Sequence, residues 1–259
     1  LNLKIQNSKI FTINNFINQK INHKSKYNLI INSFYSSRNL NKLKNYNKFV
    51  HKSLSELSIL FDNLDHKKVN KIIYTSSSSV YGSINEKILS NDKNNRHIYA
   101  SFKLSAETLL KNFCNKNDIP LIISRVFNLY GTGENFSIIS KIKKNKNNKS
   151  IKLKISNKGM SVRDFIHVDD VVMIFEKLLK IKKKSFICDV GTGFGVRIID
   201  IIESLDLKKN IIIETKKTSE IDESIADNNF LYNNLNYKKF KNIEQFFKSK
   251  KIKKITRIK

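Results

Sequence analysis

The sequence predicts an α/β protein built on a parallel, doubly wound sheet, and three observations lead to that fold class. Short apolar strand candidates alternate with long helical patterns along the first half of the chain, as in repeated β–α–β units. The 259 residues suffice for one large α/β domain or for a domain with an attached lobe. Forty per cent of the residues are hydrophobic, so the chain can bury a sizeable core.

The elements of the first half follow one another in order. Apolar runs at 10–13 and 29–31 predict two short strands. Residues 71–76 predict a third strand, 98–117 a helix and 121–124 a fourth strand. Between the second and third strands, apolar residues recur on one stripe and predict a helix: Phe49, Leu54, Leu57, Leu60, Phe61 and Leu64.

The alternation weakens after Gly131, which predicts a second, smaller lobe. A helix at 168–179 and a strand at 186–189 are expected to return to the sheet. The predicted division is therefore a first domain at 1–128 with about 165–190, and a lobe at 129–164 and 191–259.

The formal net charge of +27 raises the possibility of a nucleic-acid binder. The lysines, however, are scattered among asparagine and isoleucine along the whole chain, and arginine, the better base reader, is scarce. We therefore expect no nucleic-acid function, and weak attraction to anions such as nucleotide diphosphates instead. A basic nucleic-acid binder, the alternative, would lose affinity steeply with salt.

Cysteine content and hydropathy narrow the class further. Cys114 and Cys188 lie far apart and have no metal-ligand partners at short spacing, which argues against a disulfide scaffold or a zinc site and fits a cytoplasmic protein. No run approaches the roughly 20 apolar residues that span a bilayer, and the start of the chain resembles no signal peptide. We expect no membrane partner and no metal.

Three polar residues form a candidate catalytic set. Tyr99 and Lys103 stand four residues apart on a predicted helix and therefore share a face. A tyrosine with a pKa of about 10 is a poor base at neutral pH, and a nearby ammonium favours the phenolate. Ser77 ends the preceding predicted strand, so its hydroxyl could hold a substrate oxygen beside the phenol.

Each part of this pattern also has an ordinary structural interpretation. A Tyr-x-x-x-Lys spacing is common by chance, and the serine run 76–79 on its own is typical of a turn. Their combination, in this order and after an apolar strand, favours the catalytic interpretation.

Four blocks of the chain, in this order, resemble the extended short-chain dehydrogenase/reductase superfamily, in its branch of NAD-dependent nucleotide-sugar epimerases and dehydratases. They are Ser76–Gly82, Tyr99–Lys103 with Glu107 on the same helix, Arg125–Gly131 and Arg163–Asp170. Weaker matches follow at 189–193 and 224–227. The resemblance begins near residue 10 and implies a Rossmann-type sheet with a C-terminal substrate lobe.

The resemblance also implies roles for individual residues. Ser77 would be the catalytic serine, Tyr99 the acid/base, and Lys103 the residue that lowers the phenol pKa and binds the nicotinamide ribose. An NAD or NADP cofactor would contact Asn15, Ser76, Tyr99 and Lys103, and a nucleotide-diphosphate sugar would contact Ser78, Asn128 and Arg163.

Several of these residues have structural alternatives that the sequence leaves open. Arg163 could bind phosphate in a fork, or could form an internal salt bridge with Asp164. His167 is expected to be structural rather than a ligand or base. Asp169 and Asp170 are expected to cap the helix that follows.

The chain departs from the family pattern in two ways. It contains seven glycines and no Gly-x-x-Gly-x-x-Gly loop, which in dinucleotide-binding proteins lets the backbone approach pyrophosphate. We interpret this as the loss of about one β–α–β unit, most simply because the chain is an N-terminally truncated fragment of a longer reading frame. In addition, Phe34 and Tyr35 stand where the family has small residues beside the cofactor, and Ser53 lies near a usual cofactor-contacting asparagine.

The expected activity is transient oxidation of a sugar hydroxyl, at C4, followed by reduction from the other face. Dehydratases of this branch carry Asp-Glu where this chain has Ser78 and Ser79, so an epimerase is favoured over a dehydratase. The alternatives are a nucleotide-4-keto-sugar reductase or dehydratase of the same family, and a non-catalytic fragment or sugar-nucleotide binding module. Helices 49–64 and 98–117 could form the four-helix homodimer contact of this superfamily.

Overall fold

The structure is a computed structural model, and it describes residues 8–10, 12, 15, 25–33, 46–83, 95–131, 137–145, 151–153, 155, 157–182, 184–205, 207, 211–213, 221–247 and 255–259. The chain divides into two compact units. The first comprises Lys4–Arg125 and Phe175–Cys188, and the second Val126–Ile174 and Asp189–Lys259. Each unit is described by itself.

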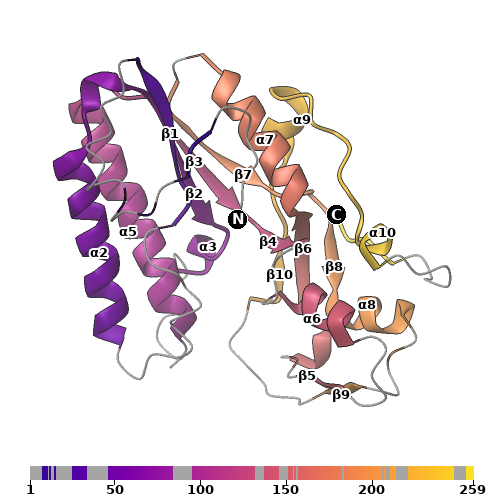
Figure 1. Ribbon diagram of the computed structural model, residues 1–259. Helices are drawn as coiled ribbons and strands as arrows, with labels where there is room; N and C mark the ends of the chain where they lie inside the picture. The colour runs from indigo at the N-terminus through magenta and orange to yellow at the C-terminus, as the bar shows by residue number, and fades with distance from the viewer. Residues whose placement is uncertain are drawn as a thin grey trace. The chain divides into compact units, whose positions relative to one another are not determined.

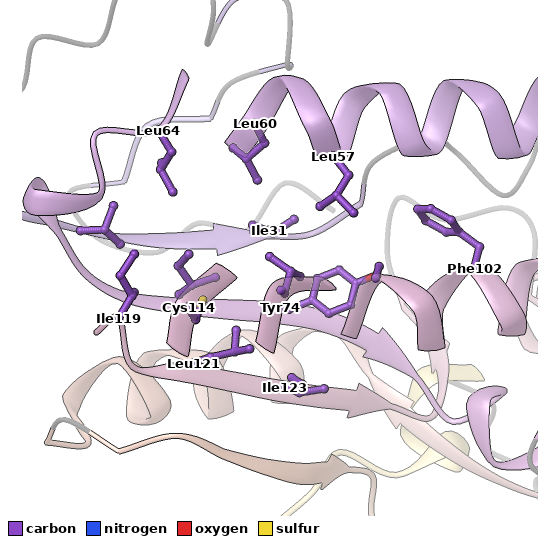
Figure 2. Close-up of a cluster of buried hydrophobic side chains, with 14 of the residues drawn as sticks. Ile31, Leu57, Leu60, Leu64, Tyr74, Phe102, Cys114, Ile119, Leu121 and Ile123 are labelled. Carbon is purple, nitrogen blue, oxygen red and sulfur yellow. The ribbon is translucent and has the colours of Figure 1, made fainter. Parts of the chain in front are cut away.

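The first unit contains a four-stranded sheet in the order β1-β2-β3-β7 (Figure 1). Strand β1 pairs in parallel with β2, and the arrows of β1, β2 and β3 point the same way in Figure 2. The sheet thus confirms the predicted parallel α/β class. Its strands are β1 Tyr27–Ile31, β2 Val69–Ser77, β3 Leu121–Val126 and β7 Phe186–Val190.

Two long helices, α2 (Tyr46–Asn63) and α5 (Asn95–Lys116), cover one face of this sheet (Figure 1). Figure 2 shows their side chains directed at the alternate residues of the strands that face them, including Ile31 and Tyr74. Phe61 and Phe113 stack with ring centroids 4.3 Å apart and join the two helices. This apolar packing fixes the position of α5 relative to β2.

The predicted stripe on α2 is buried or partly buried except at Leu54, which is 41% exposed, and its last member, Leu64, is buried just after the helix ends. The buried line passes through Ser53 instead, because Ser53 is four residues from both Phe49 and Leu57. The Ser53 hydroxyl is buried without a hydrogen-bond partner among the described residues.

A buried lysine joins β2 to the end of α7 (Val168–Lys180). Lys71 is 4% exposed, and its ammonium donates hydrogen bonds to the carbonyls of Leu178 (3.2 Å), Leu179 (3.1 Å) and Ile181. Leu178 and Leu179 belong to the last turn of α7 and Ile181 directly follows it, in a region where carbonyls lack i+4 backbone donors; the Leu178 carbonyl also accepts the Ile181 N–H at 3.3 Å. Lys71 therefore caps α7 from inside the core.

The second unit is organised around strand β6 (Val162–His167), which pairs in parallel with β4 and β10 and antiparallel with β8. A separate parallel pair is formed by β5 and β9. A second hydrophobic cluster includes Tyr130, Phe165 and Phe247. The elements of this unit are β4 Asn128–Tyr130, α6 Ile138–Asn145, β5 Ile151–Leu153, β8 Gly195–Arg197, α8 Ile198–Ser204, β9 Ile211–Ile213, β10 Glu223–Ser224, α9 Asn229–Asn233 and α10 Ile243–Phe247.

The other predicted elements agree with the structure within a few residues, as α5, β3, α7 and β7 show. The strand expected at 10–13 lies largely outside the described residues. Among the helices that the structure describes, none is both long and apolar enough to cross a bilayer.

Candidate active site

The serine run lies at the carboxyl end of β2. Buried Ile72, Ile73 and Tyr74 hold this strand in the core, and the strand ends at Ser77. A turn over 78–79 leads directly into the short helix α3 (Val80–Ser83). Ligands of parallel α/β sheets bind at such strand ends.

The Ser77 hydroxyl is fixed by the turn that follows it. Its Oγ accepts the backbone N–H of Ser79 at 3.2 Å and the Ser79 hydroxyl at 2.9 Å. Ser78 is half-buried, and its carbonyl accepts the backbone N–H of Tyr81 at 3.2 Å. The turn thus leaves the Ser77 proton available for another acceptor.

Tyr99 and Lys103 lie on the face of α5 that meets this strand end. The Lys103 side chain is buried, and its Nζ lies 5.7 Å from the centroid of the Tyr99 ring and 4.8 Å from that of Tyr74. The same ammonium donates a hydrogen bond to the carbonyl of Thr75 at 2.7 Å. The structure therefore brings the predicted lysine and tyrosine together beside β2.

Burial and hydrogen bonding set the pKa values of this pair. Burial raises the pKa of Tyr99 to about 12, and the hydrogen bond with the Ser77 hydroxyl acts in the opposite direction. Burial lowers the pKa of Lys103 to about 7, while the nearby Glu107 carboxylate raises it. Because Ser77 interacts with the phenol and Lys103 packs against its ring, all three predicted residues converge on one region of the first unit.

The expected fall in the phenol pKa is not observed, and this corrects the sequence-based argument. Desolvation of the Tyr99 phenol outweighs the interactions that favour the phenolate. In addition, Lys103 is itself desolvated, carries only part of a positive charge near neutral pH, and directs its amine to Thr75.

Ser76, expected at the cofactor, directs its hydroxyl into the core. It is 3% exposed and donates a 2.5 Å hydrogen bond to Glu107 of α5. Glu107 also pairs with Arg125 at the end of β3. Sequence reasoning assigned no role to Glu107 or Arg125, although Tyr99, Lys103 and Glu107 recur every four residues and so mark one helix face.

Asn128 and Arg163, the expected contacts to the substrate diphosphate, belong to the second unit. The Asn128 amide donates to the carbonyl of Asp164 at 3.1 Å. Arg163 Nη1 donates to the carbonyls of Val162 (2.8 Å) and Asp222 (3.4 Å). Their roles stay predictions.

The alternative salt bridge between Arg163 and Asp164 is wrong. The Asp164 carboxylate is buried and accepts the Thr192 N–H (3.0 Å), the Thr192 hydroxyl (2.7 Å), the Gly193 N–H (2.8 Å) and the Ala226 N–H (3.3 Å). Neutral donors from two loops therefore satisfy the carboxylate, which ties these loops to β6.

The cap of α7 differs from the prediction in its residue. His167, which precedes the helix, accepts the backbone N–H of Asp169 through Nδ1 at 3.1 Å, so the imidazole is the cap. Burial lowers the His167 pKa, in keeping with this acceptor role. Asp170 instead accepts the Tyr237 hydroxyl (2.7 Å) and the Lys241 N–H (2.9 Å), and Asp169 pairs with the Lys241 ammonium.

Of the predicted cofactor contacts, Asn15 remains. Asn15 is exposed, and its backbone N–H donates to Thr12 Oγ1 at 3.3 Å. Phe34 and Tyr35, expected to crowd a dinucleotide, lie outside the described residues.

The family model "NAD dependent epimerase/dehydratase family" matches residues 12–189. The dTDP-D-glucose 4,6-dehydratase of Dictyostelium discoideum is 28% identical over 204 residues, which are 72% of this chain and 46% of that protein. The chain spans about half the length of the curated relatives it matches.

Two solved structures show the same fold. The dTDP-glucose 4,6-dehydratase of Bacillus anthracis, in complex with NAD, has a TM-score of 0.65 and 18% identity and covers 85% of this chain and 70% of its own. The UDP-glucuronic acid 4-epimerase of Bacillus cereus, in complex with UDP-glucuronic acid and NAD, has a TM-score of 0.65 and 23% identity and covers 80% of this chain and 68% of its own.

Proposed function

Because this chain belongs to the NAD-dependent epimerase/dehydratase family, we propose that it acts as a nucleotide-sugar epimerase that oxidises a sugar hydroxyl transiently, at C4, in nucleotide-sugar metabolism. The observation that carries the proposal is the convergence of the Ser77 hydroxyl and the Lys103 side chain on the Tyr99 phenol. A solved relative named as a 4-epimerase shares the fold and supports it.

Each residue of this set has a chemical role in the proposal. Tyr99 would take the proton of the sugar hydroxyl as its general base, and would return a proton when the ketone is reduced. Ser77 would donate a hydrogen bond to the same substrate oxygen, since its own lone pairs face Ser79. Lys103 would stabilise the phenolate electrostatically.

The residues at the end of β2 fit the ribose end of a nicotinamide dinucleotide, NAD or NADP. Lys103 brings a buried amine and Tyr99 a phenol to this end, and the buried Thr75 hydroxyl lacks a hydrogen-bond partner among the described residues. When bound, the nicotinamide would accept hydride from the sugar carbon and return it. The sequence contains no Gly-x-x-Gly-x-x-Gly loop of the kind that binds the phosphates of a dinucleotide. We assign the first unit to the dinucleotide and the second, with Asn128 and Arg163, to the nucleotide-diphosphate sugar.

The serines after Ser77 favour epimerisation over dehydration. Water loss needs an acid and a base close to the sugar, and a hydroxyl is neither at neutral pH. In addition, the backbone N–H and the hydroxyl of Ser79 both donate hydrogen bonds to the Ser77 hydroxyl. A 4-keto-sugar reductase, which needs no such pair, is the nearest enzymatic alternative, and several curated relatives are named as dehydratases.

Turnover of UDP-, GDP- and dTDP-sugars tests the proposal, with this chain and with any longer reading frame that contains it. We expect C4 epimers as the main product and a loss of about 10²–10⁴-fold in kcat for Tyr99→Phe. Tyr27→Phe, at the amino end of β1 and so at the opposite end of the strands from Ser77, is the matched control and should retain activity. 4,6-Dehydration as the main product would refute the choice.

A non-catalytic binding module is the second candidate, because the chain spans about half the length of its curated relatives and lacks the phosphate loop. Isothermal calorimetry with NAD and NADP separates the two. Absence of binding at millimolar dinucleotide, together with binding of a nucleotide sugar, would favour the module.

We further propose a homodimer through α2 and α5 in the cytoplasm. Leu54 on α2 and Leu109 on α5 are 41% and 39% exposed, so each helix presents an apolar side chain that such a contact would cover. Sedimentation velocity should show a dimer that Leu109→Glu converts to a monomer. A monomeric unmodified chain contradicts the proposal.

A further inference from the structure

A buried carboxylate lies beside the proposed catalytic set. Glu107 is 1% exposed. Its Oε1 accepts hydrogen bonds from the Ser76 hydroxyl (2.5 Å) and from Arg125 Nε (3.1 Å), and its Oε2 accepts one from Arg125 Nη2 (2.7 Å). The ion pair is therefore a two-point fork, which fixes orientation as well as distance.

These bonds join β2 and α5, the two elements that carry the proposed chemistry, to each other and to β3. Ser76 precedes Ser77 in β2, Arg125 lies at the end of β3, and Glu107 follows Lys103 by one turn on α5. The Arg125 guanidinium also lies 4.8 Å above the ring of Tyr81, just after the serine turn. Every segment that supplies a catalytic group thus contacts this one carboxylate or its partner.

We propose that Glu107 is a positioning residue, whose carboxylate holds the ends of β2 and β3 against α5 and so sets the distance from Ser77 to Tyr99 and Lys103. This inference rests on the proposed function only in taking Ser77, Tyr99 and Lys103 as the catalytic residues. The contacts themselves belong to one compact unit.

The charge of Glu107 gives it a second effect that packing alone would not. Lys103 is buried, and the Glu107 carboxylate opposes the fall in its pKa that burial causes. The charged and titratable groups around Glu107 are Lys103 on its own helix, Tyr74 in β2, Arg125 in β3 and, through Arg125, Tyr81 in α3. Glu107 keeps its ion pair with Arg125, and its carboxylate is also the charge that raises the pKa of Lys103 against the effect of burial.

The charge effect is tested by NMR of ¹³C-labelled lysine in Glu107→Gln. The Lys103 signal is the one that titrates near pH 7 and disappears in Lys103→Met. We expect its midpoint to fall by about one pH unit in Glu107→Gln, because an opposite charge one helical turn away is lost. Asp62→Asn removes an exposed carboxylate of the same unit and should leave the midpoint unchanged. An unchanged midpoint in folded Glu107→Gln overturns the proposal.

The positioning effect is tested by a milder variant, which also serves if Glu107→Gln does not fold. Ser76→Ala removes one bond and keeps the ion pair. We expect severalfold faster hydrogen exchange at the Ser79 amide, which donates to Ser77, with the Lys103 midpoint retained. Ser185→Ala, which removes an acceptor for the Leu121 N–H elsewhere in the sheet, should not change the Ser79 amide. Equal exchange in Ser76→Ala and the unmodified chain contradicts positioning.

Neither readout depends on turnover. Suppose that the chain epimerises no sugar, but the Lys103 midpoint falls in Glu107→Gln and the Ser79 amide exchanges faster in Ser76→Ala. The proposed function is then refuted, and the positioning role of Glu107 is retained. A chain that epimerises sugars but shows neither change would support the proposed function and refute the positioning role of Glu107.

Discussion

Replacing the buried Lys103 by methionine should change how the stability of the chain depends on pH. Burial lowers the pKa of Lys103 from 10.5 to about 7. Between these values the unfolded chain binds a proton at this lysine and the folded chain does not, so the free energy of unfolding rises with pH across this window. The destabilisation by a buried ammonium is complete below about pH 7 and vanishes above pH 10.5.

The magnitude follows from the difference of about 3.5 pH units. At about 1.36 kcal/mol per unit, the buried charge destabilises the folded chain by about 5 kcal/mol below pH 7. Methionine removes this penalty and also the hydrogen bond to Thr75, which is worth about 1 kcal/mol. Lys103→Met should therefore be more stable than the unmodified chain at pH 6.5, and the advantage should shrink by about 3 kcal/mol by pH 9.5.

Urea unfolding at half-unit steps from pH 6.5 to 9.5 measures the difference. The control is Lys111→Met, an exposed lysine on the same helix, whose difference from the unmodified chain should be flat with pH. If the curves of Lys103→Met and the unmodified chain run parallel, Lys103 does not titrate in this window and the reasoning is refuted.

Three stability predictions concern other buried contacts, all measured by urea unfolding at pH 7. Lys71→Met removes the ammonium donor to the carbonyls at the end of α7 and should destabilise the first unit by about 1–3 kcal/mol, while Lys67→Met, at an exposed site, should be neutral. Tyr237→Phe leaves Asp170 without its buried hydroxyl donor and should also lower stability by about 1–3 kcal/mol; an effect no larger than that of Tyr232→Phe contradicts this. Gly191→Ala should fail to fold or lose more than about 2 kcal/mol, because a Cβ there would lie 2.4 Å from that of Ala226; a melting curve equal to that of the unmodified chain would show that the loop yields.

The sequence predicted the sheet of the first unit well because its signals are local. An apolar run as short as 71–76, flanked by longer helical patterns, favours a buried strand over a helix, and the structure has β2 at Val69–Ser77. The stripe on α2 was less well predicted, because leucine at position 54 is indistinguishable from a core leucine by type alone. The choice between Ser53 and Leu54 depends on the exact phase of the helix against the sheet, which is set by tertiary packing.

The second unit was harder, since its contacts join distant segments. Asp169 and Asp170 have the composition of a helix cap, but residues near 237–241 compete for their carboxylates. That leaves the cap to His167, whose Nδ1 lies against the Asp169 N–H. No local pattern predicts this exchange, because it depends on a chain segment almost 70 residues away.

The same distinction between spacing and environment applies to the proposed catalytic set. A four-residue spacing correctly placed Lys103 beside Tyr99, since helix geometry alone decides it. It could not give the direction of the phenol pKa, because that depends on how much water each group loses. Here desolvation keeps the phenol protonated and leaves the amine close to half-protonated at neutral pH. A negative charge near Lys103 therefore raises the protonated fraction of the amine beside the phenol. Glu107 supplies that charge. In the proposed mechanism, the strength of Tyr99 as a base therefore depends on the Glu107 carboxylate, two turns along the helix, as well as on Lys103.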